Sequence, residues 1–369
     1  MRSPLDIARA VLAGSAISVM VGASVAHATP GPTVLQPGQV VLIGPAAGTG
    51  TPTADYGIGA TDLCEFMEFP TELLQVCGDS FAGQGVGFGN WRSPIALHVD
   101  RDSVRGSGGV VYTGVTGADT PLLADATAQG TSQLPAGVVE INRENYLMVT
   151  TTRALVPIGS RLVKAEVAHG RWQTVPGSQR AAGFDGGAQS QISGYYDPIP
   201  APDSPTGWVY IVADNFNRTA PARLFRVRPR DFPDRSRWQG WSSATGWGAQ
   251  PTPLWGDRLG ELNIRQIDGL TVLSYFNADT GNMEIRVANH PTALGAAPVT
   301  TVVRAGAWPD PVEALPEPGD NMLAQPYGGY IAPGSTLDEM GVFVSQWNTG
   351  PRDRAPYRVL QFVVNPFKP

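Results

Sequence analysis

Three strand-like segments follow one another between residues 261 and 288. Glu261–Gln266 alternates polar and apolar side chains, and Asp268-Gly269 marks a tight hairpin turn into the apolar run 270–276. A second turn leads to the segment Met283–Ala288. Alternation with period two is the mark of a half-buried strand, so the stretch predicts an antiparallel meander of about 40 residues, the size of one β-propeller blade.

Similar meanders can be drawn elsewhere in the chain, over residues 57–115, 137–180, 205–245 and 325–365. Gly (44) and Pro (33) are plentiful, charged residues make up only 16 %, and no window shows sustained helical periodicity. This balance suits short strands joined by turns. We therefore predict an all-β chain with one five-bladed β-propeller domain over residues 38–369. A strand near Gln39–Ile43 would close the ring against the last blade, and a two-sheet sandwich is the alternative.

The N-terminus has the form of an export signal. Arg2 and Arg9 precede or flank an apolar run over residues 10–25, and Ala26-His27-Ala28 has the small-x-small pattern of a cleavage site. We predict a signal peptide over residues 1–28, a linker over 29–37 and a secreted or cell-envelope location. An uncleaved membrane anchor is the alternative, although the run is shorter than the ~20 residues of a spanning helix.

The charge of the chain argues against nucleic-acid binding. Removal of the charged residues of the signal, Arg2, Asp6 and Arg9, changes the formal net charge from −6 to −7. No other stretch of the sequence is apolar enough to span a membrane, and we expect a monomer. The four histidines make no metal-ligand spacing with the two cysteines, so we expect no metal and no cofactor.

Two acids flank the two cysteines symmetrically. The residue numbers of Cys64 and Cys77 have the same sum as those of Asp62 and Asp79. In an antiparallel pair with that register each residue faces its counterpart, and residues two apart share a face. Facing Cα atoms lie within disulfide reach, and export permits the bond, with reduced thiols as the alternative. Because facing like charges destabilise a sheet, the pair indicates a function, and paired carboxylates catalyse glycoside hydrolysis.

Several short motifs occur in a characteristic order. They are Thr61-Asp62-Leu63, Gly78-Asp79-Ser80-Phe81, Trp91-Arg92-Ser93-Pro94, Tyr327–Ile331 with Pro333–Thr336, Val344–Trp347, Tyr357 and Gln361-Phe362. Together they resemble the actinobacterial family first catalogued as domain of unknown function 4185, whose members are endo-D-arabinanases of glycoside hydrolase family 183. The resemblance covers roughly residues 38–366. It implies a five-bladed propeller with a carboxylate-lined pocket and D-arabinan of the mycobacterial cell wall, in arabinogalactan and lipoarabinomannan, as the substrate.

Asp62 and Asp79 are the expected catalytic pair, one as the general acid and the other as base or nucleophile. Turn and strand caps are the structural alternative, and a third acid at Glu261 is an alternative proton donor. The expected substrate-binding residues are polar or aromatic side chains near strand ends: Trp91, Arg92, Asp214, Asn215, Glu261, Asn263, Tyr327, Tyr330 and Ser335. For each of them, core packing or turn chemistry is the alternative. A short carboxyl separation would favour retention and a longer one inversion. A carbohydrate-binding propeller without activity and a structural or protein-interaction propeller are the alternative functions.

Overall fold

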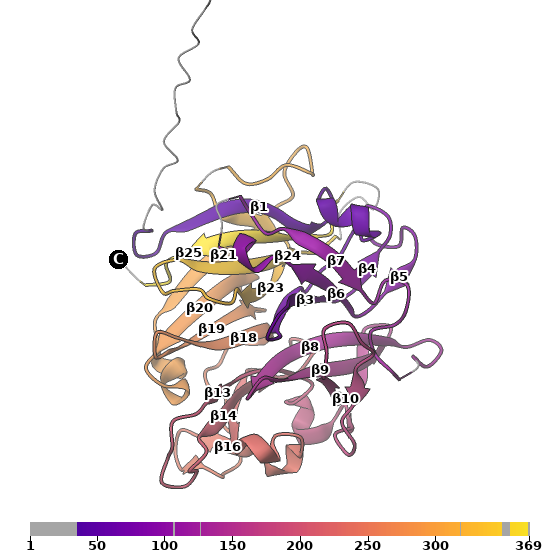
Figure 1. The fold of residues 1–369 in the computed structure, drawn as a ribbon. Coiled ribbons are helices and arrows are strands. Elements are labelled where there is room, and N and C mark those ends of the chain that lie inside the picture. The colour runs from indigo at the N-terminus through magenta and orange to yellow at the C-terminus, as the bar shows by residue number, and fades with distance from the viewer. Residues whose placement is uncertain (1–34, 106–107, 126, 318, 349–354, 368–369) are drawn as a thin grey trace, which may run out of the picture. The chain divides into compact units, whose positions relative to one another are not determined.

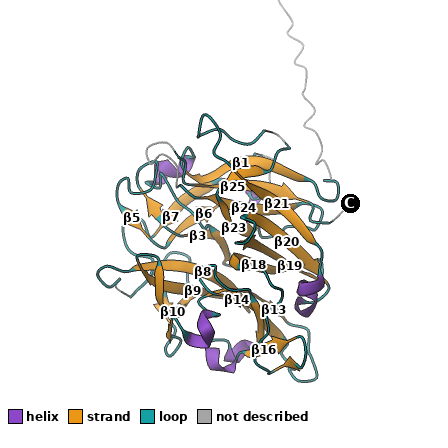
Figure 2. Ribbon diagram, turned by 180° about the vertical axis from the view of Figure 1, so that it is seen from behind, coloured by secondary structure: helices purple, strands orange, loops and turns teal. Residues whose placement is uncertain are grey.

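The computed structural model describes residues 35–105, 108–125, 127–317, 319–348 and 355–367. The chain separates into two compact units, Met1–Thr33 and Val34–Pro369, and the described residues belong to the second. The expected signal peptide and most of the expected linker therefore lie outside the described residues. Strands make up nearly all of the regular structure (Figure 2), which confirms the all-β prediction. Within the described part of the chain, no helix is long and apolar enough to cross a membrane.

The strands fall into five groups that follow one another along the chain, except that the N-terminal strand β1 belongs to the last (Figure 1). The first group is a four-stranded antiparallel sheet made of β2 (Glu65–Glu68), β3 (Leu73–Cys77), β6 (Ile95–Val99) and β7 (Tyr112–Thr116). The short strands β4 (Ser80–Phe81) and β5 (Trp91–Arg92) pair with each other in the connection between β3 and β6.

The second and third groups share one sheet. The second contains β8 (Ser132–Ile141), β9 (Glu144–Arg153), β10 (Val156–Ala165), β11 (Gln173–Thr174) and β12 (Arg180–Ala181). The third contains β13 (Gln191–Asp197), β14 (Trp208–Asp214), β15 (Arg223–Val227), β16 (Gln239–Ser242) and β17 (Gly246–Trp247). A short parallel pairing of β8 with β13 joins them. Gly137 permits this approach, since a Cβ there would lie 1.6 Å from the carbonyl oxygen of Ile192.

The fourth and fifth groups complete the fold. The fourth contains β18 (Leu259–Ile267), β19 (Leu270–Asn277), β20 (Asn282–Ala288), β21 (Val299–Gly306) and β22 (Met322–Ala324). The fifth contains β23 (Pro326–Ile331), β24 (Met340–Gln346), β25 (Arg358–Val364) and β1 (Val40–Gly48). The meander predicted for residues 261–288 is present as β18, β19 and β20. The N-terminal strand β1 pairs with β25, as predicted for the strand near Gln39–Ile43 (Figure 1).

The only helices among the described residues are short 3₁₀ turns in the connections. They are η1 (Pro52–Tyr56), η2 (Arg101–Ser103), η3 (Phe184–Gly187), η4 (Pro229–Asp231), η5 (Arg235–Arg237) and η6 (Pro291–Ala296). The third group begins earlier than the predicted range 205–245, because β13 is its first strand. Its sequence, QISGYYD, contains Ser193 and Gly194, which weaken the strand pattern.

The hydrophobic core is divided into clusters between neighbouring groups. One cluster joins the first and second groups, and others join the second to the third, the third to the fourth and the fourth to the fifth. A further cluster packs the fifth group against the first, with the rings of Phe66 and Phe343 4.9 Å apart in an edge arrangement. The first strands of the groups, β2, β8, β13, β18 and β23, contact one another in the same order, and β23 contacts β2. Each group therefore packs on two neighbours, although no sheet in the described part closes on itself.

Candidate active site

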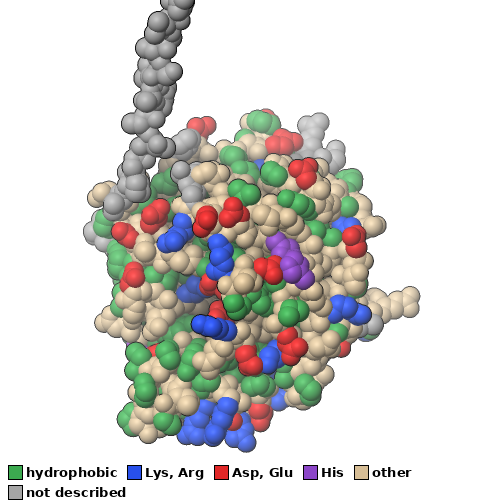
Figure 3. Space-filling model, in the orientation of Figure 1, with side chains coloured by type: hydrophobic (Ala, Val, Ile, Leu, Met, Phe, Trp, Pro, Cys, Tyr) green, Lys and Arg blue, Asp and Glu red, His purple; other side chains and the backbone are tan. Residues whose placement is uncertain are grey.

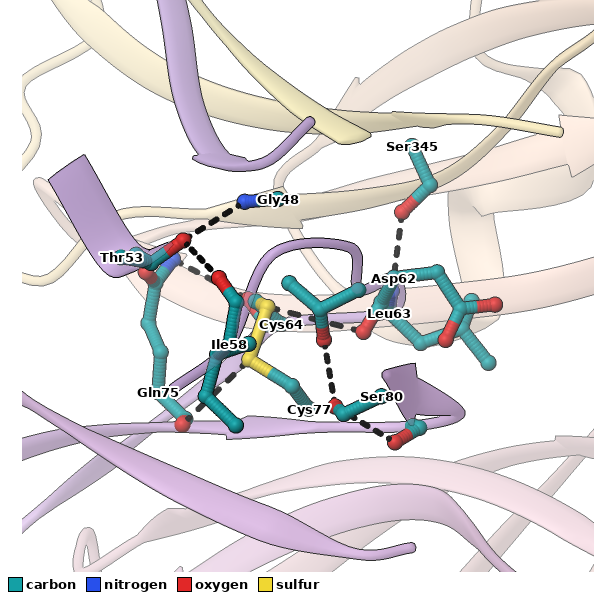
Figure 4. The surroundings of a disulfide bond; sticks show 12 residues. Gly48, Thr53, Ile58, Asp62, Leu63, Cys64, Gln75, Cys77, Ser80 and Ser345 are labelled. Atoms are coloured by element: carbon teal, nitrogen blue, oxygen red, sulfur yellow. Dashed lines mark hydrogen bonds between the residues drawn. A yellow bond between two sulfur atoms is a disulfide. The ribbon is translucent and has the colours of Figure 1, made fainter. Parts of the chain in front are cut away.

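The segment before β2 is bent so that Asp62 faces the interior. Glu65 pairs with Val76 and Phe66 with Gln75, which is the register predicted from the cysteines. The disulfide Cys64–Cys77 is formed, with Cα atoms 4.0 Å apart. Leu63 then adopts φ 50°, in the left-handed region, and its N–H donates to Ser345 Oγ at 2.9 Å (Figure 4). This bend shifts the pairing by one residue, and the N–H of Gly78 donates to the carbonyl of Asp62.

The two predicted acids therefore do not face each other as a strand pair. Asp62 lies over Gly78, where an added Cβ would be 2.5 Å from Asp62 Oδ1. Asp79 follows Gly78 in the turn between β3 and β4. Both side chains nevertheless line the same cavity, which has a volume of about 760 Å³. We call it the acid cavity, and its polar and aromatic lining consists of Asp62, Asp79, Asn217, Arg218, Glu261, Gln325, Phe216, Phe276, Tyr327 and Trp347.

Asp62 is the most strongly perturbed acid of this cavity. Its side chain is buried, and the Tyr327 hydroxyl donates to Oδ2 at 2.6 Å. Burial, followed by the charge of Asp79, raises the pKa of Asp62 to about 8, although the hydroxyl groups of Tyr327 and Tyr357 act in the opposite direction. Asp62 is therefore protonated at neutral pH, the state that a general acid requires.

Asp79 is less buried, and the Trp91 indole donates to its Oδ1 at 2.7 Å. Burial raises the pKa of Asp79, and the bond from Trp91 lowers it. Trp91, one of the expected substrate-binding residues, is 40 % exposed and is outside the lining of the acid cavity. Its hydrogen bond to Asp79 is therefore its contact with this site. Arg92 is also outside the lining, because its guanidinium donates to the carbonyls of Ala118 and Gly57.

Glu261 and Arg218 form an ion pair in the lining of the acid cavity. Arg218 donates to Glu261 Oε1 through Nε at 3.0 Å and also through Nη2. The guanidinium lies over the rings of Phe276 and Tyr327, at 5.0 and 5.1 Å from their centroids. Arg218 thereby contacts both Glu261, in the fourth group, and Tyr327, whose hydroxyl donates to Asp62.

Asp214 stands behind this pair at the end of β14. Its side chain is fully buried, and neither carboxylate oxygen accepts a hydrogen bond from another described residue. Burial and then the charge of Glu261 raise the pKa of Asp214 well above its ordinary value. Asn215 holds the following turn, since it bonds Thr219 through both Oδ1 and Nδ2. The N–H of Arg218 donates to the carbonyl of Asn215, so this turn positions Arg218. Neither Asp214 nor Asn215 lines the cavity.

Two of the other predicted binding residues lie in a different place. Asn263 and Ser335 line a second cavity, of about 570 Å³, together with Glu65, Glu140, Arg143 and Arg265. Both polar atoms of the Asn263 side chain bond within the protein. Nδ2 donates to Glu65 Oε1 at 2.8 Å, and Oδ1 accepts from the N–H of Ile331. Ser335 bonds within its own turn, to Ala332 and Gly341. Tyr330 is buried in the cluster with Leu63, Tyr327 and Tyr357, and it lines neither cavity.

Sequence reasoning did not select Arg218, Phe276, Trp347 or Tyr357 for the site. Arg218 lies three residues after the predicted Asn215, but its φ of 57° and its bond to Glu261 depend on the tertiary fold. Trp347 ends the motif Val344–Trp347, and its ring lines the cavity. The tip of the β9–β10 hairpin adds Leu155 and Val156, which are 54 % and 61 % exposed. Apolar side chains at a solvent-exposed loop gave no signal for a site.

Comparison with known proteins supplies the family. Residues 47–363 match the family described as Domain of unknown function (DUF4185). The chain belongs to this family. A protein of Mycolicibacterium smegmatis, named as an uncharacterized 35.9 kDa protein in the asd 3′ region, is 69 % identical over 331 residues, which are 89 % of this chain and 99 % of that protein.

Solved structures share the fold of this DUF4185 protein at low sequence identity. A Bacteroides ovatus protein, provisionally described as a hydrolase, matches with a TM-score of 0.54 and 10 % identity over 84 % of this chain and 86 % of that one. The exo-β-1,3-galactanase of Phanerochaete chrysosporium, solved with β-1,3-galactotriose, matches with a TM-score of 0.52 and 10 % identity over 87 % of this chain and 64 % of that one. At this identity the likeness concerns the fold alone.

Proposed function

We propose that this protein is an exported, endo-acting glycoside hydrolase that cleaves D-arabinofuranosyl linkages in mycobacterial cell-wall arabinan. The observation that carries the proposal is the position of Asp62, a buried and protonated acid, in one cavity with Asp79 and Glu261. Glycoside hydrolysis needs a proton donor and a second carboxylate on the same site. D-arabinan as the substrate rests on the resemblance of the sequence motifs to endo-D-arabinanases.

In this mechanism Asp62 donates its proton to the leaving glycosidic oxygen as an oxocarbenium-like centre develops. Asp79 is the second carboxylate and acts as base or nucleophile, with Glu261 as the alternative partner. The rings of Trp347 and Phe276 supply apolar faces for the sugar, and Arg218 offers positive charge beside them. Activity should fall as the pH rises through about 8, because Asp62 then loses the proton that it donates.

The proposal extends to architecture and location. The five strand groups would be the blades of a single propeller, and β1 would complete the last blade. The support is the cycle of hydrophobic clusters, in which each group packs on the next and the fifth packs on the first. The disulfide supports export, because such bonds persist in oxidising compartments.

The test is incubation of the purified chain with mycobacterial arabinogalactan, beside Asp62→Asn, Asp79→Asn and Glu261→Gln. Glu339→Gln, on an exposed side chain, is the matched control. We expect arabino-oligosaccharides from the wild type and the control, and none from Asp62→Asn and Asp79→Asn. Loss in Asp62→Asn and Glu261→Gln with activity kept in Asp79→Asn would move the partner role to Glu261. Binding without release by the wild type would establish the carbohydrate-binding alternative instead.

A further inference from the structure

Three side chains with metal-binding atoms meet away from both cavities. Glu72 precedes β3, His98 lies in β6, and His169 lies in the segment between β10 and β11. Glu72 Oε2 is 3.1 Å from His98 Nδ1 and 2.7 Å from His169 Nε2. The three ligand atoms all lie within 4.8 Å of one another. The trio therefore links the first strand group to the second.

Both nitrogens of His98 have partners that fit a metal ligand. Nδ1 lies 3.1 Å from Glu72 Oε2, and Nε2 lies 2.8 Å from Thr116 Oγ1, which can accept the N–H of Nε2 when Nδ1 binds an ion. Metal-binding histidines commonly use their second nitrogen in this way. The imidazole is buried, so its position is fixed by the surrounding fold.

The three ligand atoms contact one another, through Glu72 Oε2, in the place where an ion would bind. The two imidazole rings are stacked with centroids 4.4 Å apart and an angle of 15° between their planes. Arg101 donates to the backbone carbonyl of Glu72, so this bond does not occupy the carboxylate. The side chain of His169 is 66 % exposed and Glu72 is 31 % exposed, which gives an ion access from solvent. Histidine side chains with acidic side chains close by are visible on the face shown in Figure 3.

We propose that Glu72, His98 and His169 bind a divalent transition-metal ion, with Zn²⁺ as the best match. Two imidazole nitrogens and one carboxylate oxygen are a typical zinc ligand set, and water would complete a tetrahedron. With bonds of about 2.0–2.1 Å, tetrahedral geometry places ligand atoms roughly 3.3 Å apart. The distances of 3.1 and 2.7 Å approach this value. Because an ion lies close to the plane of each imidazole that binds it, the exposed His169 must also rotate out of its stacked position to admit the ion.

This site differs from the expectation that the chain binds no metal. The expectation followed from histidine spacing along the sequence, and residues 72, 98 and 169 are too far apart to form a pattern there. The bound ion would cross-link the first and second groups, which also pack together through the hydrophobic cluster that contains Met67 and Trp172. It lies outside the acid cavity, so the proposal is independent of the hydrolase proposal.

The experiment is titration of the full chain, produced without a polyhistidine tag, with ZnCl₂ by calorimetry and with CoCl₂ by visible absorption. We expect one saturable site per chain, a Co²⁺ spectrum of four-coordinate type and a higher Tm with Zn²⁺. His169→Ala and Glu72→Gln should each weaken Zn²⁺ binding by at least about 100-fold and remove the Tm increase. His169→Ala changes an exposed side chain, so its fold is retained.

His290→Ala is the matched control, because His290 bonds Thr292 and Tyr210 and lies apart from the trio. It should bind Zn²⁺ like the wild type. Absence of saturable binding by the wild type would overturn the proposal and leave a hydrogen-bonded trio. Equal binding by His169→Ala, Glu72→Gln and the wild type would also overturn it. Neither readout involves sugar cleavage, so the hydrolase proposal does not affect the outcome.

Discussion

At the scale of single residues, Asp62 is held out of water although an ionised carboxylate prefers solvent. Its Oδ2 accepts a hydrogen bond from Tyr327, and its Oδ1 has no partner among the described residues. An acid in such a place favours its neutral form and thereby gains a proton that it can donate. Burial of this acid lowers the free energy of unfolding at neutral pH, and the loss can be measured.

Asp62→Asn should stabilise the protein, by an amount that grows with pH. The unfolded carboxyl ionises near 3.8, and the folded one near 8. Between these values the folded state holds a proton that the unfolded state has lost, so wild-type stability falls as the pH rises. Asparagine mimics the neutral acid and removes this loss, which amounts to at most about 1.4 kcal/mol per pH unit.

Urea unfolding of both proteins at several pH values between 5 and 8 is the measurement. The free-energy difference between Asp62→Asn and the wild type should widen across this range and level off above it. Glu339→Gln should follow the wild type. Parallel stability curves for Asp62→Asn and the wild type would mean that Asp62 ionises in the folded protein as it does in solvent.

Gly78→Ala should reduce both activity and stability. A Cβ at this position would lie 2.5 Å from Asp62 Oδ1, so the carboxylate must move out of its place. We expect kcat to fall at least tenfold, with a loss of about 1–3 kcal/mol in the free energy of unfolding from overpacking. Gly183→Ala is the control, since its φ is −82° and open space surrounds the new Cβ. Wild-type kcat in Gly78→Ala would contradict the role of Asp62.

At the scale of elements, the β2–β3 pair shows what sequence symmetry can and cannot predict. The register followed from the positions of Cys64 and Cys77, because a disulfide fixes which residues face each other. The prediction failed at Asp62, two residues before Cys64, because Leu63 between them enters the left-handed region. Such a conformation in a residue other than glycine has no sequence signature, and here the Ser345 hydroxyl, 282 positions away, stabilises it.

Removal of the disulfide tests how far this element depends on its cross-link. Cys64 and Cys77 are fully buried, and the bond spans 13 positions of sequence. A loop of this length corresponds to about 3 kcal/mol of unfolded-state entropy. We expect Cys64→Ala/Cys77→Ala to lose about this much in urea unfolding. The wild type should lose a similar amount in reductant, and reductant should leave the double variant unchanged. A double variant as stable as the wild type would show that β-pairing alone holds the hairpin.

At the scale of the whole molecule, repeated period-two alternation predicted where the strand groups lie. It missed β13, whose serine and glycine hide the pattern. Asn263 and Ser335, selected from the sequence as binding residues, line the second cavity and not the acid cavity. For Asn263 the reason is geometric. Inner strands run from one cavity to the other, so Glu261 and Asn263, two residues apart on β18, line different cavities. A strand pattern predicts which residues share a face of the sheet. It does not predict which of those residues lies at which cavity.

The strand β1 packs into two of the hydrophobic clusters. It pairs with β25, and its two ends serve different cores: Ala46 and Ala47 pack in the cluster between the fifth and first groups, while Val40 and Leu42 pack against the cluster between the fourth and fifth. Deletion of residues 1–48 would expose the edge of β25 and open both clusters. Unpaired sheet edges of this kind promote aggregation.

We therefore expect a chain that begins at Thr49 to lose several kcal/mol of stability and to associate, whereas a chain that begins at Leu35 keeps the wild-type Tm. Thermal unfolding and size-exclusion chromatography are the measurements. A synthetic peptide of residues 35–50, added to the shorter chain, should restore the Tm, because β1 contributes through strand pairing and burial and not through chain connectivity. Equal Tm values for the two truncated chains would show that the five groups pack together without β1. In that case the contacts between neighbouring groups, rather than the N-terminal strand, would hold the fifth group against the first.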